Sequence, residues 1–428
     1  MVKPVMVVGG GIAGIQAALD LADQGIKVYI VEKRPSIGGR MAQLDKTFPT
    51  LDCASCILTP KMVAVGRHPN VTLLTYSEVK EIKGSAGNFD VTILKKPRYV
   101  DESKCTGCGL CVQKCPYKAT SEFNMGLGTR KAIYFEFPQA VPLIPVIDRA
   151  NCAYFQKGVC RVCERFCEAK AINFNQTPEE IKLNVASIII ATGFELEDPR
   201  KKETYGYGRY ANVYTSLEFE RLVSATGPTS GEIVRRSDNQ HPKRIVFIQC
   251  VCSRDLLVNF WCSAFCCMAS TKEAILAKEH LPNVDCVVLY MDIRAFGKGY
   301  QEFFDRARQQ FGIRFIRGKP AKIEEMPESK NLIVYYEDTE LGYLRKIEAD
   351  MVVLAVGAKL QPVGPAINLP LDEDGFVKVK NRYLSPVETE VEGIYVAGLA
   401  AGPKDIPDSV TEASAAAIKA SLLALGGR

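Results

Sequence analysis

Val5-Met6-Val7-Val8-Gly9-Gly10-Gly11-Ile12-Ala13-Gly14 is the stretch that decides the fold of this chain. A short apolar run meets a glycine-rich turn, and apolar residues with helical spacing follow over 15–24. A second apolar run over 28–31 ends in Glu32. The sequence therefore predicts a strand, a tight turn, a helix and a second strand that ends in an acid.

This order indicates a dinucleotide-binding βαβ unit. Gly9 permits the tight turn, Gly11 lets the backbone approach a pyrophosphate, and Gly14 lets the helix and the strand pack closely. The unpaired N–H groups at the helix N-terminus attract phosphate, and Glu32 stands where a carboxylate accepts a hydrogen bond from a ribose hydroxyl. The alternative is a glycine turn in an ordinary βαβ unit.

Segments near both ends of the chain resemble the FAD-binding signatures of the glutathione and thioredoxin reductase class. The loop 33–40 contains a Gly-Gly pair, and 393–398 reads Gly-Ile-Tyr-Val-Ala-Gly before a helix expected over 409–425. The strands 188–193 and 352–357 look like the two Ala-Thr-Gly-type strands of that class. The resemblance implies one FAD domain spread along the chain, with further FAD contacts at Lys33, Gly39, Arg40, Thr192, Gly193, Gly398, Lys404 and Asp405.

Composition bounds the possible functions. For 428 residues we expect two or three domains, and 47% hydrophobic residues suffice for a core. The net charge of +5 is small and the basic residues are not interleaved with aromatic ones, so nucleic acid is not an expected partner. No apolar run reaches the roughly 20 residues that span a bilayer, and the stretch before the glycines is too short for a signal peptide. We therefore expect a cytoplasmic protein, in which 16 cysteines indicate metal clusters or redox thiols rather than structural disulfides.

Two cysteine runs interrupt the flavoprotein pattern between 96 and 180. The first has the spacing C-x2-C-x2-C-x3-C-P of bacterial ferredoxins, and the second keeps the last two gaps but has seven residues in its first gap. In two-cluster ferredoxins the fourth cysteine of each run binds the other cluster. We therefore assign two 4Fe–4S clusters, one to Cys105, Cys108, Cys111 and Cys167 and the other to Cys152, Cys160, Cys163 and Cys115. Zinc is the competing interpretation.

Cys53-Ala-Ser-Cys56 forms a further cysteine pair in the first part of the chain. Beside a flavin, a Cys-x-x-Cys pair could be a redox-active dithiol, as in disulfide reductases. It could also be half of a metal site that another chain completes, or two buried free thiols. The sequence leaves these three interpretations open.

A third cysteine group stands where a second nucleotide site is expected. The strand expected over 244–249 should lead into a glycine-rich NAD(P)H-binding turn, but five cysteines occur in the next 18 residues instead. A backbone without those glycines cannot approach a pyrophosphate, so NAD(P)H is not an expected ligand. We assign a third 4Fe–4S cluster to Cys250, Cys262, Cys266 and Cys267, with Cys252 as the spare. The alternative is a thiol-rich start of the helix expected over 268–280.

These patterns predict an α/β, thioredoxin-reductase-like flavoprotein with two dinucleotide-type domains and an inserted bacterial-type ferredoxin with two clusters. The expected boundaries are 1–95, 181–242 and 361–428 for the FAD domain, 96–180 for the insertion, and 243–360 for the degenerate second domain. The segment 131–148 is expected to be an extended, proline-rich linker. After the third cysteine group we expect a strand over 284–291 and a helix over 303–311.

The chain also resembles one particular family closely: the A-type subunits of heterodisulfide reductase, which are the flavin subunits of flavin-based electron-bifurcating complexes. The segments that carry the resemblance are the inserted ferredoxin, 48–61, 131–141, 249–267 and 402–409. Compared with the larger members of that family, we expect a short form without their N-terminal domain and C-terminal ferredoxin. Cys252 stands where the family usually has glycine.

The resemblance implies a function. A flavin takes up electrons in pairs and can release them singly to clusters, while the protein sets distances and potentials. The family takes an electron pair from a hydrogenase or formate dehydrogenase, and passes one electron to ferredoxin and the other to a disulfide-reducing subunit. The expected partners are therefore such a donor, ferredoxin and subunits of the B and C types, in a complex that contains a homodimer of this chain.

By the same resemblance Lys272 lies near the flavin N5, and Glu220 is its partner. The alternatives are a surface lysine and a solvated helix acid. Two other functions stay open for the whole chain. One is a non-bifurcating flavin relay of a quinone- or sulfur-linked oxidoreductase, and the other is an NAD(P)H-dependent disulfide reductase that uses Cys53 and Cys56.

Overall fold

The computed structural model describes residues 2–361 and 367–426 and divides the chain into two compact units. Unit 1 comprises Met1–Ala42, Ser55–Phe194 and Leu360–Arg428, and unit 2 comprises Gln43–Ala54 and Glu195–Lys359. The chain passes between them along β12 (Phe194–Leu196) and β21 (Ala358–Leu360), which form a two-stranded sheet. The glycine-rich turn, the loop 33–40, the strand at 188–193, the C-terminal signature at 393–398 and the ferredoxin-type runs belong to unit 1. The second strand of the Ala-Thr-Gly type, 352–357, and the third cysteine group belong to unit 2.

Unit 1 is built on a seven-stranded sheet. Its strand order is β22 (Val379–Asn381), β23 (Ser385–Thr389), β24 (Ile394–Val396), β11 (Ser187–Ile190), β1 (Val5–Val8), β2 (Val28–Glu32) and β3 (Val71–Thr75). The strand β1 is buried along its whole length and pairs in parallel with both β2 and β11. A central parallel strand is covered on both faces, which explains why its sequence is a continuous apolar run.

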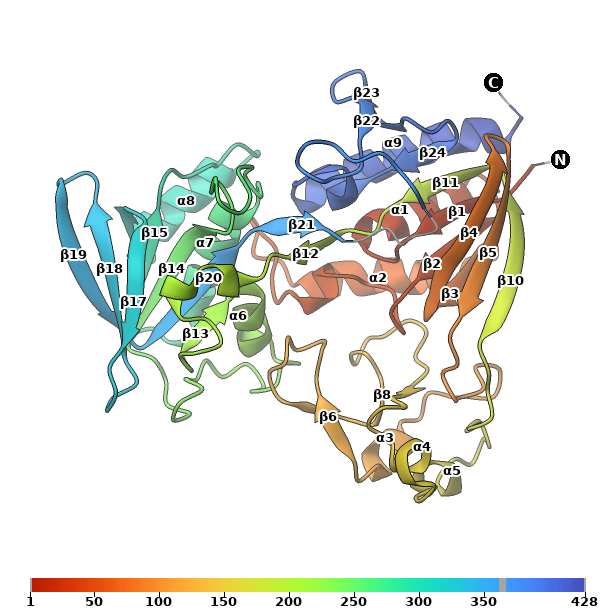
Figure 1. Cartoon of the computed structure of the whole chain (residues 1–428), viewed down its shortest axis with the longest axis horizontal. Helices are drawn as coiled ribbons and strands as arrows, with labels where there is room; N and C mark the ends of the chain where they lie inside the picture. The colour runs from red at the N-terminus through yellow and green to blue at the C-terminus, as the bar shows by residue number, and fades with distance from the viewer. Residues whose placement is uncertain (1, 362–366, 427–428) are drawn as a thin grey trace. The chain divides into compact units, whose positions relative to one another are not determined.

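Two helices, α1 (Ile12–Ala22) and α9 (Ile406–Ala424), lie side by side along this sheet (Figure 1). Both bury small side chains, among them Ala17 and Ala416, which lets the helix axes approach closely. The helix α1 begins three residues before the expected start at 15, because Gly14 without a side chain can lie on β1 as part of the helix. A third helix, α2 (Ala54–Arg67), contains Pro60.

A three-stranded antiparallel sheet carries the ferredoxin-type insertion. Its order is β10 (Glu179–Val185), β5 (Asn88–Lys95) and β4 (Ser77–Ser85). Lys95 at the end of β5 pairs with Glu179 at the start of β10, so the chain leaves this sheet and returns to it at neighbouring residues. Insertions at such hairpin ends are well tolerated, because no core residue has to move.

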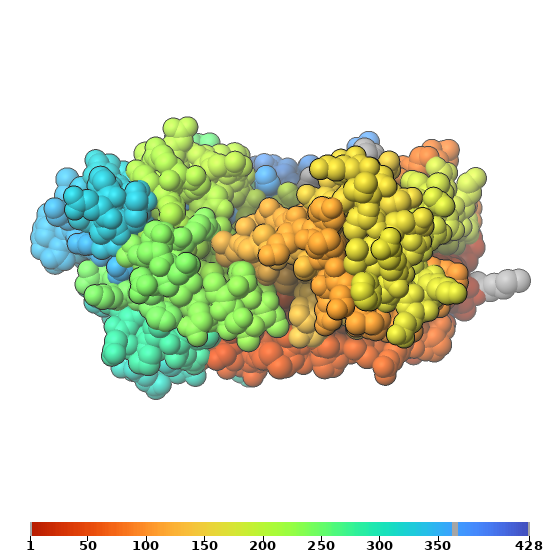
Figure 2. Space-filling model, turned by 90° about the horizontal axis from the view of Figure 1, so that it is seen from below, coloured from red at the N-terminus to blue at the C-terminus, as the bar shows by residue number. Residues whose placement is uncertain are grey.

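The insertion is a region of short elements around its own small core. They are α3 (Leu110–Lys114), β6 (Lys118–Thr120), β7 (Thr129–Lys131), β8 (Ile133–Tyr134), β9 (Val146–Ile147), α4 (Ala153–Lys157) and α5 (Val162–Arg165). Aromatic rings fill the core together with the cysteines, and the rings of Tyr154 and Phe174 lie 4.1 Å apart. Figure 2 shows the insertion as one continuous region, orange to yellow. The segment 131–148 is extended in part, with β8 and β9 pairing near its ends.

Several hydrogen bonds fix the insertion to the loop after β2. Arg98 is 1% exposed and donates from Nη2 to the Pro35 carbonyl at 2.6 Å. The N–H of Val141 donates to Ser36 Oγ at 2.8 Å, and the N–H of Ile37 donates to the Val141 carbonyl at 3.0 Å. The nucleotide loop and the insertion are therefore tied together by hydrogen bonds within unit 1.

Unit 2 is built on a five-stranded parallel sheet. Its order is β13 (Val213–Thr215), β20 (Met351–Val356), β14 (Arg244–Val251), β15 (Asp285–Tyr290) and β16 (Arg314–Arg317). The helices of this unit are α6 (Ser216–Val223), α7 (Cys266–His280) and α8 (Tyr300–Gln309). A second sheet contains β17 (Pro320–Glu325), β18 (Leu332–Asp338) and β19 (Tyr343–Ala349). Because α7 contacts α6, α8, β14 and β15, it is the central helix of the unit (Figure 1).

The units divide the chain differently from the sequence-based boundaries. Residues 195–242, expected in the FAD domain, belong to unit 2, because β13 pairs in parallel with β20. The loop 43–54 also belongs to unit 2, although the chain on both sides of it belongs to unit 1. Among the described residues, no helix combines the length and apolar character needed to cross a membrane.

Candidate functional site

The turn between β1 and α1 requires glycine at two positions. Gly9 has φ 109°, and a Cβ there would lie 2.3 Å from the Ala191 carbonyl oxygen. A Cβ on Gly14 would lie 1.9 Å from the Gly9 carbonyl oxygen. Gly11 differs, because the nearest atom to a Cβ there is the Gly39 Cα at 4.0 Å. This open side of Gly11 adjoins the N-terminus of α1, which has no side-chain cap, so the fold leaves room and N–H donors for a phosphate.

Glu32 is fixed by the turn itself. It is 8% exposed at the end of β2, its Oε2 accepts the Gly10 N–H at 2.6 Å, and its Oε1 accepts the Arg34 N–H at 2.8 Å. Burial raises the pKa of Glu32, and the two N–H donors oppose the rise. A ribose hydroxyl would add a further donor to a carboxylate that is already oriented. Lys33, the next residue, is exposed.

The loop 33–40 closes the other side of the turn. Gly39 has φ 57°, and a Cβ there would lie 2.8 Å from the Gly11 Cα. The Arg40 guanidinium lies 5.9 Å from the ring centroid of Phe194, and its Nη1 lies 3.8 Å from the sulfur of Met125. Arg40 therefore extends toward the insertion, and its contact with FAD stays a prediction.

Thr192 and Gly193 follow β11 and test whether the residues fit a bound group. The Thr192 Oγ1 is buried and has no hydrogen-bond partner among the described residues. Gly193 has φ 74°, and no atom lies within 4 Å of a Cβ placed there. A buried hydroxyl without a partner is costly, so the position fits a ligand that is rich in donors and acceptors, as FAD is.

The C-terminal signature is tied to α9 by an ion pair. Lys404 Nζ lies 2.9 Å from Glu412 Oε2 and donates to the Gly398 carbonyl at 2.8 Å. Burial lowers the pKa of Lys404 and raises that of Glu412. Asp405 caps α9 by accepting the Asp408 N–H at 2.9 Å. Lys404 and Asp405 therefore hold the turn at Gly398, and Glu412, which no sequence motif marks, completes it.

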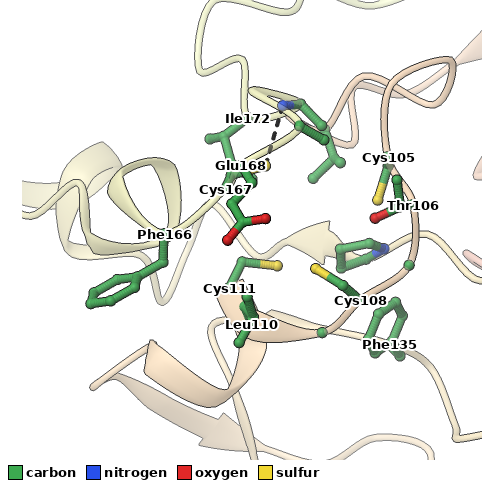
Figure 3. Close-up of a pocket in the computed structure, with 16 residues that line it drawn as sticks. Cys105, Thr106, Cys108, Leu110, Cys111, Phe135, Phe166, Cys167, Glu168 and Ile172 are labelled. Carbon is green, nitrogen blue, oxygen red and sulfur yellow. Dashed lines mark hydrogen bonds between the residues drawn. The ribbon is translucent and has the colours of Figure 1, made fainter.

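In the insertion, four cysteines from both runs line one cavity of about 350 Å³: Cys105, Cys108, Cys111 and Cys167. Figure 3 shows the thiols of Cys105, Cys108 and Cys111 directed into the shared space, with Cys167 beside them. Burial and the neighbouring thiols raise the pKa of Cys111 to about 12. A thiolate here needs a positive partner, which the irons of a cluster would supply.

The other four cysteines of the two runs line a second, smaller cavity of about 20 Å³: Cys115, Cys152, Cys160 and Cys163. Burial and neighbouring thiols raise the pKa of Cys163 to about 12. The two cavities divide the eight thiols in the way that the fourth-cysteine rule of two-cluster ferredoxins requires. In the part of the chain that the structure describes, no three His, Cys, Asp or Glu side chains are arranged around a single metal ion. Occupation of both cavities by 4Fe–4S clusters stays a prediction.

The third cysteine group gathers where β14 approaches the start of α7. Cys250 lies on β14, Cys266 and Cys267 open α7, and Cys262 lies in the connection. Burial, together with the other three thiols, raises the pKa of Cys266 well above its usual value. The four thiols assigned to a third cluster are therefore neighbours, and the helix begins two residues earlier than expected so as to include two of them.

The connection that carries this group has an unusual backbone. Cys250, Cys252, Arg254 and Ala264 all have positive φ, between 53° and 63°. Such strain persists only where the surrounding structure requires it, and it gathers at functional sites. Cys252 is separate from the group, with its Sγ 3.7 Å from the Asp198 carbonyl oxygen. The guanidinium of Arg254 lies beside Cys250, and sequence analysis did not single it out.

Cys53 and Cys56 are exposed and disulfide-bonded. The interpretation as two buried free thiols is therefore wrong, because neither residue is buried or free. A redox-active dithiol and half of a shared metal site both require accessible cysteines, and both interpretations stay open.

Comparison with known proteins gives matches along the whole chain. Three family models match: "FAD dependent oxidoreductase" at residues 4–50, "4Fe-4S binding domain" at 98–120, and "Pyridine nucleotide-disulphide oxidoreductase" at 271–417. The A-type iron-sulfur subunit of CoB–CoM heterodisulfide reductase from Methanocaldococcus jannaschii is 56% identical over 425 residues, which is 98% of this chain and 64% of the relative. The chain belongs to the family of heterodisulfide reductase A-type subunits.

Other relatives support the same family. The A-type subunit of the H2/formate:CoB–CoM heterodisulfide,ferredoxin reductase of Methanococcus maripaludis is 54% identical over 97% of this chain and 63% of its own length. The A-type subunit of the corresponding H2:CoB–CoM enzyme of Methanothermobacter thermautotrophicus is 52% identical over 97% of this chain and 63% of its own length. The chain thus spans 63–64% of the length of these three relatives. The expected class, a flavin- and iron–sulfur-containing oxidoreductase, is confirmed at this level.

Solved structures confirm the fold of this family member. The thioredoxin reductase of T. acidophilum superposes with a TM-score of 0.54 at 18% identity, covering 98% of this chain and 97% of the other. The Lactococcus lactis enzyme gives 0.55 at 14% identity and covers 99% of both chains. The expectation of a thioredoxin-reductase-like fold with an inserted ferredoxin-type segment is therefore confirmed.

The residues that the heterodisulfide reductase resemblance singled out, Lys272 and Glu220, meet in unit 2. Lys272 Nζ lies 2.6 Å from Glu220 Oε1, and both side chains are 2% exposed. Lys272 also donates to the Lys46 carbonyl at 2.8 Å, and Glu220 accepts the Asp45 N–H at 3.0 Å. Neither residue is a surface group, so the interpretations as a surface lysine and as a solvated helix acid are both wrong. The pair holds the loop 43–54 between α6 and α7, and its position relative to FAD stays a prediction.

Proposed function

We propose that this chain is the FAD- and iron–sulfur-containing electron-transfer subunit of a heterodisulfide-reductase-like complex, and that it divides electron pairs between two acceptors. The names of its relatives support the proposal, since they include H2 or formate together with the CoB–CoM heterodisulfide and ferredoxin. The thioredoxin-reductase-like fold supports a flavin, and the 4Fe-4S match supports at least one cluster.

The observation that carries the proposal is the division of the thiols between two places. Eight line the two cavities of the insertion, which is fixed to the nucleotide loop by Arg98 and Val141. Four gather in unit 2 at the start of α7. A flavin exchanges two electrons and each cluster carries one, so two separate cluster groups supply two one-electron branches.

The chain's own residues would prepare the site for FAD. Gly11 and the N-terminus of α1 would bind the pyrophosphate, and Glu32 would accept the ribose hydroxyl. Thr192 Oγ1 would gain a partner in the bound flavin nucleotide. Lys272 would present a single positive charge, which Glu220 orients and balances, to the reduced and negatively charged form of the cofactor.

The composition of the anaerobically reconstituted protein tests this proposal first. We expect about one FAD and about twelve irons per chain, because three 4Fe–4S clusters contain twelve irons. Four irons or fewer would contradict it. Redox titration then separates pair division from a simple relay: division requires the second one-electron potential of the flavin to lie above the first. The opposite order would favour the non-bifurcating relay to a quinone- or sulfur-linked acceptor.

The proposed partners follow from the same reasoning. Subunits of the B and C types, a hydrogenase or formate dehydrogenase and ferredoxin would occupy the two branches, and the chain would be present as a homodimer. Affinity purification of the native complex under anaerobic conditions, followed by mass spectrometry of its subunits, tests this set. Recovery of the chain alone at its monomer mass would contradict the proposed assembly.

A second candidate function is favoured by the exposed disulfide at Cys53 and Cys56. An NAD(P)H-dependent disulfide reductase would use this pair and would bleach its flavin with NADPH alone, and Cys53→Ser would abolish the subsequent disulfide turnover. The connection from Cys250 to Cys267 contains no glycine, so the backbone there offers no pyrophosphate turn. Absence of bleaching by either nicotinamide cofactor would remove this candidate.

A further inference from the structure

Beside the Lys272–Glu220 pair, unit 2 buries a second acid that the pair does not account for. Glu273 is 1% exposed on α7, compared with 2% for both Lys272 and Glu220. One cation and two acids therefore share a site from which water is almost excluded. If all three groups were ionised, the site would carry a net negative charge, which is unfavourable in a buried position.

The packing of α7 on α6 brings the two acids together. Ser216 and Glu220 are four residues apart on α6 and so share one face of that helix. Glu273 contacts both of them, and its contact with Glu220 is between carboxyl groups. Two carboxylates cannot hydrogen-bond, because both only accept; a bond requires that one of them carries a proton.

The charged and backbone donors near this site are already engaged, and the Ser216 hydroxyl is the donor that remains beside Glu273. Lys272 Nζ is held by Glu220 Oε1 and by the Lys46 carbonyl, and the Asp45 N–H is donated to Glu220. Glu273 Oε2 receives no N–H or O–H donor from any described residue. Burial and the charge of Glu220 raise the pKa of Glu273 well above its usual value, while Lys272 opposes the rise.

The surrounding charges do not provide a second cation for Glu273. Asp45 is a half-buried acid whose pKa is raised, chiefly by partial burial and by Glu220. The charged or titratable groups that face the acids and their neighbour Asp45 are Lys272 and His280 on α7, Glu220 and Arg221 on α6, and Lys46 on the 43–54 loop. The buried Arg221 acts on Glu220 and Asp45, and its Nη1 donates to the Gln43 carbonyl at 3.0 Å. Lys272 is the cation that acts on Glu273. Of the cations, Lys46 forms its own pair with Glu279 at 2.7 Å.

We propose that Glu273 and Glu220 share one proton in the folded protein, and that this carboxyl pair, rather than Glu220 alone, is the counter-ion of Lys272. Two acids with one proton carry one negative charge, which balances one ammonium group. The proton can move between them: the O–H bond on Glu273 breaks, an O–H bond on Glu220 forms, no electron moves, and Lys272 stays protonated.

This arrangement gives Lys272 a means of changing partners. When the proton lies on Glu273, Glu220 is an anion and binds the ammonium group. When the proton moves to Glu220, that ion pair weakens, and Lys272 becomes available to another negative charge. The link to electron transfer rests on the proposed function, in which the reduced flavin is that charge. Glu273 is accordingly a positioning residue, since it acts through Glu220 and Lys272.

Infrared spectroscopy of the folded protein at about pH 7 tests the shared proton, because a protonated carboxyl absorbs apart from ionised ones. We expect one such band, shifted in deuterated water, and its loss in Glu273→Gln. We also expect its loss in Glu220→Gln, because the remaining acid then ionises to pair with Lys272. Glu218→Gln is the matched control: Glu218 is buried on the same helix but is bonded to the Thr215 N–H and to Arg236, so the band should persist.

The outcomes separate this proposal from the proposed function. No band in the wild-type protein, or a band that survives in folded Glu220→Gln, would overturn the shared proton. The Glu220→Gln result decides the matter even if Glu273→Gln fails to fold. The measurement needs neither turnover nor partner proteins. If the flavin proves to be a simple relay but the band is present, the shared proton is still supported. If the flavin divides electron pairs but the band is absent, only the shared proton is refuted.

Discussion

Gly11 gives the sharpest test of the nucleotide site, because it can be changed without disturbing the fold. Its φ is −76°, which alanine adopts freely, and an added Cβ meets no atom closer than the Gly39 Cα at 4.0 Å. Gly11→Ala should therefore leave the free energy of unfolding of the apoprotein almost unchanged. The methyl group would occupy the space left for the pyrophosphate, and overpacking of this kind costs about 1–3 kcal/mol. This corresponds to an increase of roughly 5- to 150-fold in the Kd for FAD.

Titration of the apoprotein with FAD, followed by flavin fluorescence, measures this change, and thermal unfolding of the apoprotein reports the fold. Gly14→Ala should behave in the opposite way: its Cβ would lie 1.9 Å from the Gly9 carbonyl oxygen, so the fold itself should lose about 3 kcal/mol or more. Gly25→Ala is the control, with open space and φ 79°; it should cost about 1–2 kcal/mol of stability and leave FAD affinity intact. An unchanged Kd in Gly11→Ala would refute the phosphate cradle.

Four further outcomes are expected. Lys272→Met should destabilise unit 2 by about 3–5 kcal/mol, because it leaves Glu220 buried without its cation. Fluorescence of Trp261, the single tryptophan of the chain, measures this unfolding. Lys278→Met, on the same helix, is the control. Cys115→Ser should remove the electron paramagnetic resonance signal of one ferredoxin-type cluster and spare the other, whereas loss of both signals would contradict the grouping of the cysteines. Arg98→Ala should cost about 3 kcal/mol, since charged hydrogen bonds to a buried loop are lost, and differential scanning calorimetry would detect it. Because the pKa of Glu273 is raised in the folded protein, this acid stabilises the fold at low pH, and the stabilisation is lost as pH rises through the raised value. Glu273→Gln should therefore have the same free energy of unfolding as the wild type at low pH and a higher one at high pH. Parallel curves of unfolding free energy against pH for the two proteins would contradict this.

The nucleotide turn was readable from the sequence because its requirements are local. Gly9 and Gly14 are required by close contacts, which lie within the turn itself or with the residue that follows the adjacent strand β11. The order of strand, turn and helix is visible in the apolar pattern of the sequence. The cysteine grouping was readable for a similar reason, since ligand spacing along the chain reflects the geometry of a cluster. Both inferences needed a motif in which chemistry and spacing coincide.

Other parts of the site depend on contacts between distant segments. Glu412 reaches the Lys404 turn from the middle of α9, and Arg98 reaches the Pro35 carbonyl across 63 positions in the sequence. No sequence motif marks Glu273, and its burial depends on the packing of α7 on α6. The grouping of 195–242 with unit 2 could not be predicted, because β13 is only three residues long and its pairing with β20 leaves no periodic signal.

The joint between the insertion and the nucleotide loop has a consequence for electron tunnelling. Tunnelling rates fall steeply with the separation between donor and acceptor. The rate of electron transfer across a hinged connection would therefore vary with each thermal movement of the hinge. Here the loop after β2 and the ferredoxin-type insertion are joined by hydrogen bonds, and the buried guanidinium of Arg98 adds another between them. If FAD and the ferredoxin-type clusters occupy these segments as proposed, the length of the electron-transfer step between them should stay constant, and control of its timing would lie at another step.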